Sequence, residues 1–248
     1  MSNASSLSLA LRIWRQRHDE PAGRFLTYRL TGLSPDLSLL EALDRLNQQL
    51  LLEGERPVHF EHDCREGICG SCGFLVNGQA QGPQSGSTVC QLYLREFSDG
   101  QTLTLEPWRA RAFPLIQDLA VDRSSLDRVL MAGGYVSVNI GSAPEANALP
   151  VGRELAAQAF EAASCIGCGA CVAACPNASA SLFVAAKLAH LDLLPQGQPE
   201  AAQRSRRLRE RMAQEGFGVC GNQLECAAAC PKEIPSALIS RMNRHARS

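Results

Sequence analysis

The sequence predicts an α+β protein built from two unlike parts, a small mixed domain over residues 1–108 and an all-α domain over residues 152–248. Apolar and polar residues near the N-terminus alternate with the period of two that is typical of strands. Beyond residue 152 this alternation gives way to helical spacing, and residues 109–151 form a connecting segment. The cysteines divide in the same way, with one group in the first part and two groups in the second.

The first part begins with two strands and a helix. Residues 7–13 and 26–30 alternate in period two on either side of turn-forming residues, which predicts a β-hairpin. Ser38 and Glu41 form the S-x-x-E pattern of a capping box, so a helix starts there, and Gly54 ends it. Further short strands are expected over residues 58–61, 73–78 and 103–106, with a polar loop over residues 79–88.

The second part is expected to be helical throughout. An amphipathic stretch over residues 115–130 precedes it in the connecting segment. Helices are predicted over residues 154–163, 178–194, 200–215 and 236–247. The arginines of the third of these helices are expected to form a solvated face, and they stand at positions 204, 206, 207, 209 and 211.

Composition excludes some classes of protein. The 24 basic and 25 acidic residues leave a formal charge of −1, so no nucleic-acid partner is expected. No run approaches the roughly 18 apolar residues that span a bilayer, and the N-terminus shows no charged-then-apolar signal peptide. Without a secretion signal, the 11 cysteines favour metal ligation over a disulfide framework. Structural zinc is the alternative, although all 11 positions fit iron–sulfur spacings.

The first cysteine group has the spacing of a plant-type [2Fe–2S] site. Cys64, Cys69 and Cys72 give C-x4-C-x2-C, and Cys90 follows as the fourth ligand. Glycines at positions 67, 70 and 73 let backbone N–H groups approach the negatively charged sulfides. The pattern therefore predicts a [2Fe–2S] cluster in this loop.

Two further groups share the ending Cys-Pro. Residues 165–176 follow the bacterial-ferredoxin spacing C-x2-C-x2-C-x3-C-P, in which the last cysteine ligates a second cluster. Residues 220–231 have the same frame, but Gln223 stands where the middle cysteine should be. The two groups are therefore expected to exchange their last ligands. The ligands predicted for a [4Fe–4S] cluster are Cys165, Cys168, Cys171 and Cys230.

The three remaining cysteines are Cys175, Cys220 and Cys226. Three thiolates hold three irons, and the glutamine at position 223 is a poor iron ligand, so the prediction is a [3Fe–4S] cluster. A labile [4Fe–4S] cluster with water or another residue on the fourth iron is the alternative. Because cluster charge affects the reduction potential, a three-iron site suits the high-potential end of an electron-transfer route.

The chain resembles the iron–sulfur subunits of succinate dehydrogenases and fumarate reductases over nearly its whole length. The resemblance rests on the three cysteine groups in this order and on four further stretches, which are residues 113–119, 121–123, 194–200 and 215–218. It implies a ferredoxin-type β-grasp domain followed by a helical two-cluster domain.

The family also implies partners and a route for electrons. A flavoprotein with covalent FAD would interconvert succinate and fumarate, and electrons would pass through the [2Fe–2S], [4Fe–4S] and [3Fe–4S] clusters to quinone at a membrane anchor. The chain itself would bind no dicarboxylate, and it would lie peripherally on the cytoplasmic face of the inner (cell) membrane. Succinate oxidation is the predicted direction, and a quinol:fumarate reductase working in reverse is the alternative.

The sequence departs from the best-known members beside the last cluster. Those members carry a tryptophan pair and a histidine where this chain has residues 177–180 and Gly221. In this respect it resembles the branch paired with a single haem-bearing cytochrome b, which implies menaquinone as the acceptor. Candidate contacts to quinone or the anchor are Asn177, Ser179, Lys187 and His190, and helix capping or solvation is the alternative role for them.

Two other functions stay open at this point. An electron carrier for another flavoenzyme, of the glycolate- or heterodisulfide-oxidoreductase type, is the first, although such relatives usually append Cys-Cys-Gly domains and no Cys-Cys occurs here. A non-redox zinc scaffold is the second.

Overall fold

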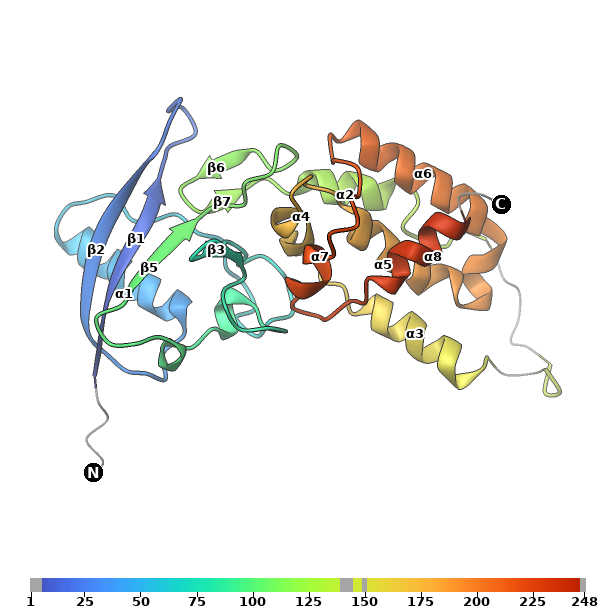
Figure 1. Cartoon of the computed structure of the whole chain (residues 1–248), viewed down its shortest axis with the longest axis horizontal. Helices are drawn as coiled ribbons and strands as arrows, with labels where there is room; N and C mark the ends of the chain where they lie inside the picture. The colour runs from blue at the N-terminus through green and yellow to red at the C-terminus, as the bar shows by residue number, and fades with distance from the viewer. Residues whose placement is uncertain (1–5, 139–144, 149–150, 246–248) are drawn as a thin grey trace.

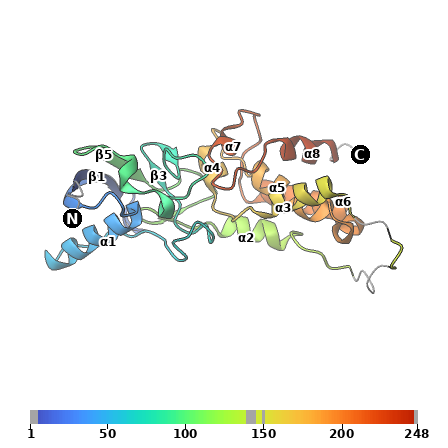
Figure 2. The same cartoon turned by 90° about the horizontal axis from the view of Figure 1, so that it is seen from below.

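The computed structural model describes residues 6–138, 145–148 and 151–245, and two unlike halves lie end to end in it (Figure 1). The sheet and the N-terminus lie at one end, and most of the helices and the C-terminus lie at the other. A view turned by 90° shows the same elongated arrangement (Figure 2). Each half has its own apolar core, and the core of the helical half takes in Phe113 and Leu126 of the expected connecting segment.

Five strands form the sheet of the first half. They are β1 (Leu7–Arg15), β2 (Arg24–Leu33), β3 (Leu75–Val76), β4 (Gln79–Ala80) and β5 (Thr102–Glu106), in the order β2-β1-β5-β3-β4. β1 and β2 pair antiparallel, which confirms the predicted hairpin, and β5 runs parallel to β1 on its other side. Leu9, Leu11 and Ile13 of β1 are buried, as the period of two requires.

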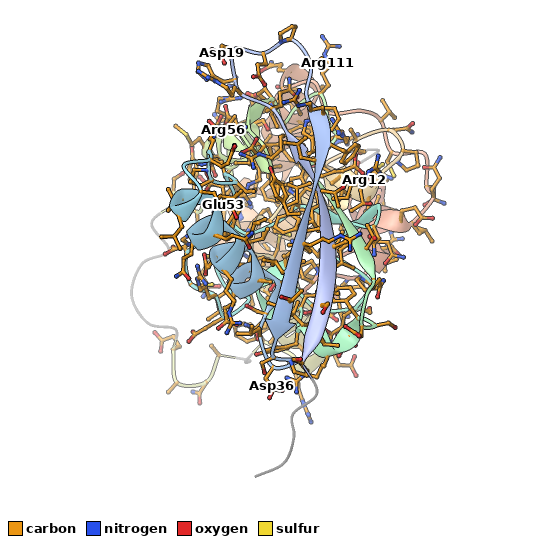
Figure 3. All side chains as sticks on the ribbon, turned by 90° about the vertical axis from the view of Figure 1, so that its left-hand side faces the viewer. Arg12, Asp19, Asp36, Glu53, Arg56 and Arg111 are labelled. Carbon is orange, nitrogen blue, oxygen red and sulfur yellow. The ribbon has the colours of Figure 1, made fainter. Side chains whose placement is uncertain are left out.

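Helix α1 (Leu39–Leu52) packs against this sheet. The N–H of Glu41 donates to Ser38 Oγ, and the Glu41 carboxylate accepts from the Ser38 N–H, so the predicted capping box is present. Leucines of α1 and β1 share one core. Seen from the sheet end, α1 with Glu53 just beyond its last turn lies beside the β1–β2 ribbon, and Arg12 projects from the opposite side (Figure 3).

The strand expected over residues 58–61 does not form, although Val58 and Phe60 are buried. The side chain of Asn47 on α1 hydrogen-bonds to the backbone of Val58, as a neighbouring strand would. Its Nδ2 donates to the Val58 carbonyl over 2.9 Å, and its Oδ1 accepts from the Val58 N–H over 2.7 Å. The backbone polar groups are thereby satisfied without sheet pairing.

The expected strand over residues 73–78 is shorter than predicted, and part of the loop expected after it is a strand. Gln79–Ala80 forms β4 and pairs with β3 across Asn77 and Gly78. Both turn residues have positive φ, 52° and 78°, as an Asn-Gly hairpin turn requires.

The expected amphipathic stretch divides into a ribbon and a helix, β6 (Leu115–Gln117), β7 (Ala120–Val121) and α2 (Ser124–Met131). Asp118 forms the turn of the ribbon with φ 48°, and its side chain is fully buried. The carboxylate forms ion pairs with Arg15 (3.3 Å) and Arg56 (2.9 Å), and it accepts from the backbone N–H groups of Gln16 and His59. This buried anion ties the ribbon to the sheet.

The helices that follow are α3 (Arg153–Ala163), α4 (Ala170–Ala174), α5 (Ser181–Asp192), α6 (Ala201–Gln214), α7 (Glu225–Ala228) and α8 (Ala237–His245). Short 3₁₀ turns cover Val89–Gln91, Leu94–Glu96 and Pro195–Glu200.

Helix α5 packs against α3, α6 and α8, which accounts for its nearly unbroken apolar sequence. It begins at Ser181 rather than at residue 178, because Ala178 has a left-handed φ of 49°. The last two residues of the helix expected over 236–247 lie outside the described residues.

The expectation of a solvated arginine face on α6 is wrong for Arg204. Its side chain is 1% exposed and forms ion pairs with Asp192 (2.5 Å) and Glu200 (3.3 Å), and it also donates to the carbonyls of Gly197 and Tyr135. A buried cation persists only when it is paired in this way.

Among the residues that the structure describes, no helix is both long enough and apolar enough to cross a bilayer.

Candidate metal centres

The first cysteine loop surrounds one of its own thiols with backbone donors. The N–H groups of Glu66, Ile68 and Cys69 donate to Cys64 Sγ over 3.4, 3.4 and 3.3 Å. These donors, the Glu66 N–H foremost, lower the pKa of Cys64 to about 7. The loop therefore stabilises the thiolate, which is the form of cysteine that binds metal.

Cys72 and Cys90 meet in the buried part of the same site. The pKa of Cys90 is lowered to about 5, first because the Cys72 thiol forms a hydrogen bond to it. The Thr88 hydroxyl (3.1 Å) and the Gly67 N–H (3.3 Å) also contact the Cys90 sulfur and lower its pKa further. The pKa of Cys72 is raised by the same hydrogen bond and by burial. Since Cys72 also interacts with Cys69, the structure brings all four predicted ligands of the first group together.

The second set lies in the helical half. Four cysteines line one small pocket, and they are Cys165, Cys168, Cys171 and Cys230. Its other walls include the apolar side chains of Leu182, Phe183 and Ile234. Burial raises the pKa of Cys168 to about 11 and raises that of Cys171 well above its usual value. Such thiols ionise when a bound metal replaces the proton.

The third set lies at α7 and is more open. Burial raises the pKa of Cys226, and so do Cys175 and Cys220, which places these three thiols near one another. Gln223 is exposed in the same loop, where a Cβ on Gly221 would lie 2.7 Å from both ends of its amide. Because Cys226 also raises the pKa of Cys171, the third set adjoins the second.

The donors in these sites fit iron–sulfur clusters. The ligand atoms are cysteine sulfurs, as in such clusters. Backbone N–H groups also approach the sulfurs of Cys64 and Cys90, and the N–H of Ile234 lies 3.4 Å from the sulfur of Cys230. Within the described parts of the chain, no three His, Cys, Asp or Glu side chains converge closely enough to hold one single metal ion. The cysteines of the second set surround a pocket instead, and a multi-iron cluster needs that arrangement because its ligands are spread over several irons.

The first and second cysteine loops touch each other. A Cβ on Gly70 would lie 2.7 Å from the carbonyl oxygen of Ile166 and 3.2 Å from the Cα of Cys168. Cys69 and Cys165 line a shared pocket. Only a glycine allows this approach, and Gly70 also has a positive φ of 73°.

Two residues that the sequence did not mark as functional hold this contact. Arg123 donates to the carbonyls of Gly70 (2.5 Å) and Ser71 (3.4 Å) on one loop and of Cys168 (3.2 Å) on the other. The Nε1 of Trp108 donates to the same Cys168 carbonyl over 3.3 Å. For Arg123, the available signal was its place in the 121–123 stretch that supports the family resemblance.

The four candidate quinone or anchor contacts lie in different surroundings. Asn177 is exposed beside the third set, and its Nδ2 donates to the Val219 carbonyl over 3.0 Å. Ser179 is buried, with its hydroxyl 2.8 Å from that of Ser181. Lys187 lines the pocket shared with Cys69 and Cys165. Burial, and then the charge of Lys187, lowers the pKa of His190.

Comparisons with family models agree with the two halves. Residues 10–128 match a 2Fe-2S iron-sulfur cluster binding domain, and residues 161–234 match a 4Fe-4S dicluster domain. A chain of the Mycobacterium smegmatis Sdh1 complex in the apo form has the same fold, with a TM-score of 0.72 at 20% identity over 97% of this chain and 95% of that one. These matches confirm the predicted fold class.

Curated relatives cover most of the chain. The succinate dehydrogenase iron-sulfur subunit of Bacillus subtilis is 30% identical over 221 residues, which are 85% of this chain and 81% of that relative. The fumarate reductase iron-sulfur subunit of Escherichia coli O157:H7 is 29% identical over 213 residues, which are 82% of this chain and 79% of that relative.

Proposed function

Since the chain belongs to the family of succinate dehydrogenase and fumarate reductase iron–sulfur subunits, we propose that it carries single electrons from a flavoprotein subunit toward quinone at a membrane anchor. Bound clusters supply the one-electron steps between a two-electron donor and a two-electron acceptor. The ligands are the 11 cysteines in the three sets described above. The dicarboxylate active site lies on the partner subunit.

The order of the three sets in space carries this proposal. Gly70 brings the first loop against Ile166 and Cys168 of the second, and the thiols of Cys171 and Cys226 join the second set to the third. The sets therefore form a series from the sheet half to the open loop at α7. A series of this kind serves stepwise electron transfer along the chain.

EPR spectroscopy of the assembled complex tests the proposal. We expect about nine irons per chain, from clusters of two, four and three irons. Succinate should reduce the three-iron cluster and remove its oxidised-state signal. A zinc-loaded, colourless chain, or clusters that succinate leaves unchanged, would contradict the proposal.

We propose succinate oxidation as the direction and fumarate reduction as the alternative, since relatives of both kinds match the chain. Cluster potentials decide between them. Rates of succinate:quinone and quinol:fumarate turnover in the same membrane preparation would separate the two directions.

The third set is proposed to hold [3Fe–4S], because Gln223 offers no thiolate beside Cys175, Cys220 and Cys226. Replacing Gln223→Cys should convert the three-iron EPR signal into that of a four-iron cluster. Gln214→Cys, at the exposed last residue of α6, is the matched control and should leave the signal unchanged. A three-iron signal that persists in Gln223→Cys would contradict the assignment.

The anchor is proposed to contact the loop at the third set. Val219 and Leu224 are 84% and 47% exposed there, and Asn177 donates to the Val219 carbonyl. Such apolar exposure is typical of an interaction surface. We propose a haem-bearing cytochrome b anchor with menaquinone, and a peripheral position on the cytoplasmic face of the inner (cell) membrane. Asn177→Ala should slow quinone reduction and leave reduction of an artificial acceptor unchanged.

A further inference from the structure

Gln81, in the loop after β4, is an unusual buried residue. It is 2% exposed and has a positive φ of 68°, and nothing in its sequence surroundings marks it as functional. Its Oε1 accepts from the N–H of Val89 over 3.0 Å, directly beside Cys90. This bond fixes the orientation of the amide, because the reversed orientation would place the NH₂ group against another donor.

The amide nitrogen of Gln81 is left without an acceptor. Among the described residues its Nε2 makes no hydrogen bond, although the side chain is buried. A buried donor without an acceptor is destabilising, and native proteins rarely retain one unless something else accepts its hydrogen. The unpaired NH₂ group therefore calls for an acceptor that is in place only when the nearby cysteines hold their cluster.

The surroundings of this nitrogen lead to the second cysteine set. A Cβ on Gly73 would lie 3.1 Å from the Nε2 of Gln81 and would also clash with the ring of Trp108. Trp108 in turn donates to the Cys168 carbonyl. Gly169, the residue after Cys168, lies against the same ring, because a Cβ there would be 3.5 Å from the Trp108 Nε1. The Gln81 side chain therefore lies near the Cys168 thiol.

We infer that the side-chain amide of Gln81, supplied by the sheet half, donates an N–H···S hydrogen bond to the sulfur of Cys168 when the [4Fe–4S] cluster is bound, and that this bond raises the reduction potential of the cluster. The inference rests on the proposed [4Fe–4S] site. Reduction adds negative charge to the cluster and its ligand sulfurs, so a donor to sulfur stabilises the reduced state more than the oxidised state. One amide would then link the backbone beside Cys90 to Cys168.

The inference is tested by an EPR-monitored redox titration of the assembled complex. Gln81→Met keeps an unbranched side chain of similar length and removes the donor. We expect the ratio of reduced to oxidised [4Fe–4S] at a fixed ambient potential to fall about tenfold, which is about 59 mV for a one-electron couple. The [2Fe–2S] potential should move much less. Gln84→Met, an exposed position in the same loop, is the matched control and should shift neither potential.

A second measurement detects the donated proton itself rather than the reduction potential. In the wild-type complex, ENDOR spectra of the reduced [4Fe–4S] cluster in H₂O and D₂O should show an exchangeable proton coupling that Gln81→Met lacks. An unchanged [4Fe–4S] potential, an equal shift of both clusters, or absence of that proton would overturn the inference while the clusters remain present. Absence of the [4Fe–4S] signal from the wild type would overturn the proposed function instead.

Discussion

The two halves of the molecule hold their cysteines in different ways. In the sheet half, donors two to five residues along the chain surround Cys64, and they lower its pKa to about 7. In the helical half, Cys165 and Cys230 meet across a long stretch of chain, and burial raises the pKa of Cys168 and Cys171. A local motif therefore prepares the first site, whereas the second depends on how distant helices pack.

The halves also differ in the sign of their buried charge. Asp118 is an anion between two arginines in the sheet half, and Arg204 is a cation between two carboxylates in the helical half. Each ties elements that are distant in sequence. Substitutions at these positions compare how strongly each half depends on its ion cluster.

The largest effect is expected for Asp118→Ala. The change leaves Arg15, which is 6% exposed, without its carboxylate partner in the core. Removing one partner of a buried pair costs about 3–5 kcal/mol, so urea titration should show the free energy of unfolding reduced by that amount. Asp36→Ala removes half of an exposed pair with Arg95 and should cost at most about 1 kcal/mol. Equal losses in the two variants would show that the buried cluster is not needed for stability.

A smaller loss, on the order of 3 kcal/mol, is expected for Arg204→Met. Its partners Asp192 and Glu200 are 17% and 16% exposed, so water can partly solvate them when the cation is gone. Arg206→Met on the exposed face of α6 is the control and should stay within about 0.5 kcal/mol. If Arg204→Met destabilised the protein more than Asp118→Ala, the helical half would be the more dependent on its ion cluster.

Gly70→Ala tests the contact between the halves. Gly70 and Gly78 have nearly the same φ, 73° and 78°. No atom of the described residues lies within 4 Å of a Cβ on Gly78, whereas a Cβ on Gly70 would lie 2.7 Å from the Ile166 carbonyl oxygen. Gly70→Ala should therefore cost about 1–3 kcal/mol more than Gly78→Ala in urea unfolding. It should also weaken the EPR spin–spin coupling between the first two clusters. Identical behaviour of the two variants would mean that the loops are not in close contact.

The sequence predicted those features that depend on near neighbours. The hairpin of β1 and β2, the capping box at Ser38 and the cysteine groups follow from short-range patterns, and the family matches agree with [2Fe–2S] binding in the first domain and [4Fe–4S] binding in the second. The errors occur where one side chain acts across the fold. Asn47 replaces a strand at Val58, Asp118 interrupts an amphipathic stretch, and Arg204 enters the core. Local periodicity contains no information about such partners.

Arg123 joins the two kinds of site, and Arg123→Lys is expected to change the stability of the protein least. A lysine keeps the charge, but its single ammonium group cannot reproduce the planar fork that contacts Gly70 and Ser71 on one loop and Cys168 on the other. Losing about one hydrogen bond should reduce the free energy of unfolding by about 1 kcal/mol. Arg111→Lys at an exposed position should change nothing (Figure 3).

If the local motif prepares the first site and packing prepares the second, EPR of Arg123→Lys should show an unchanged [2Fe–2S] spectrum and a weaker spin–spin coupling to the [4Fe–4S] cluster. A [2Fe–2S] spectrum altered as much as the coupling would contradict that division.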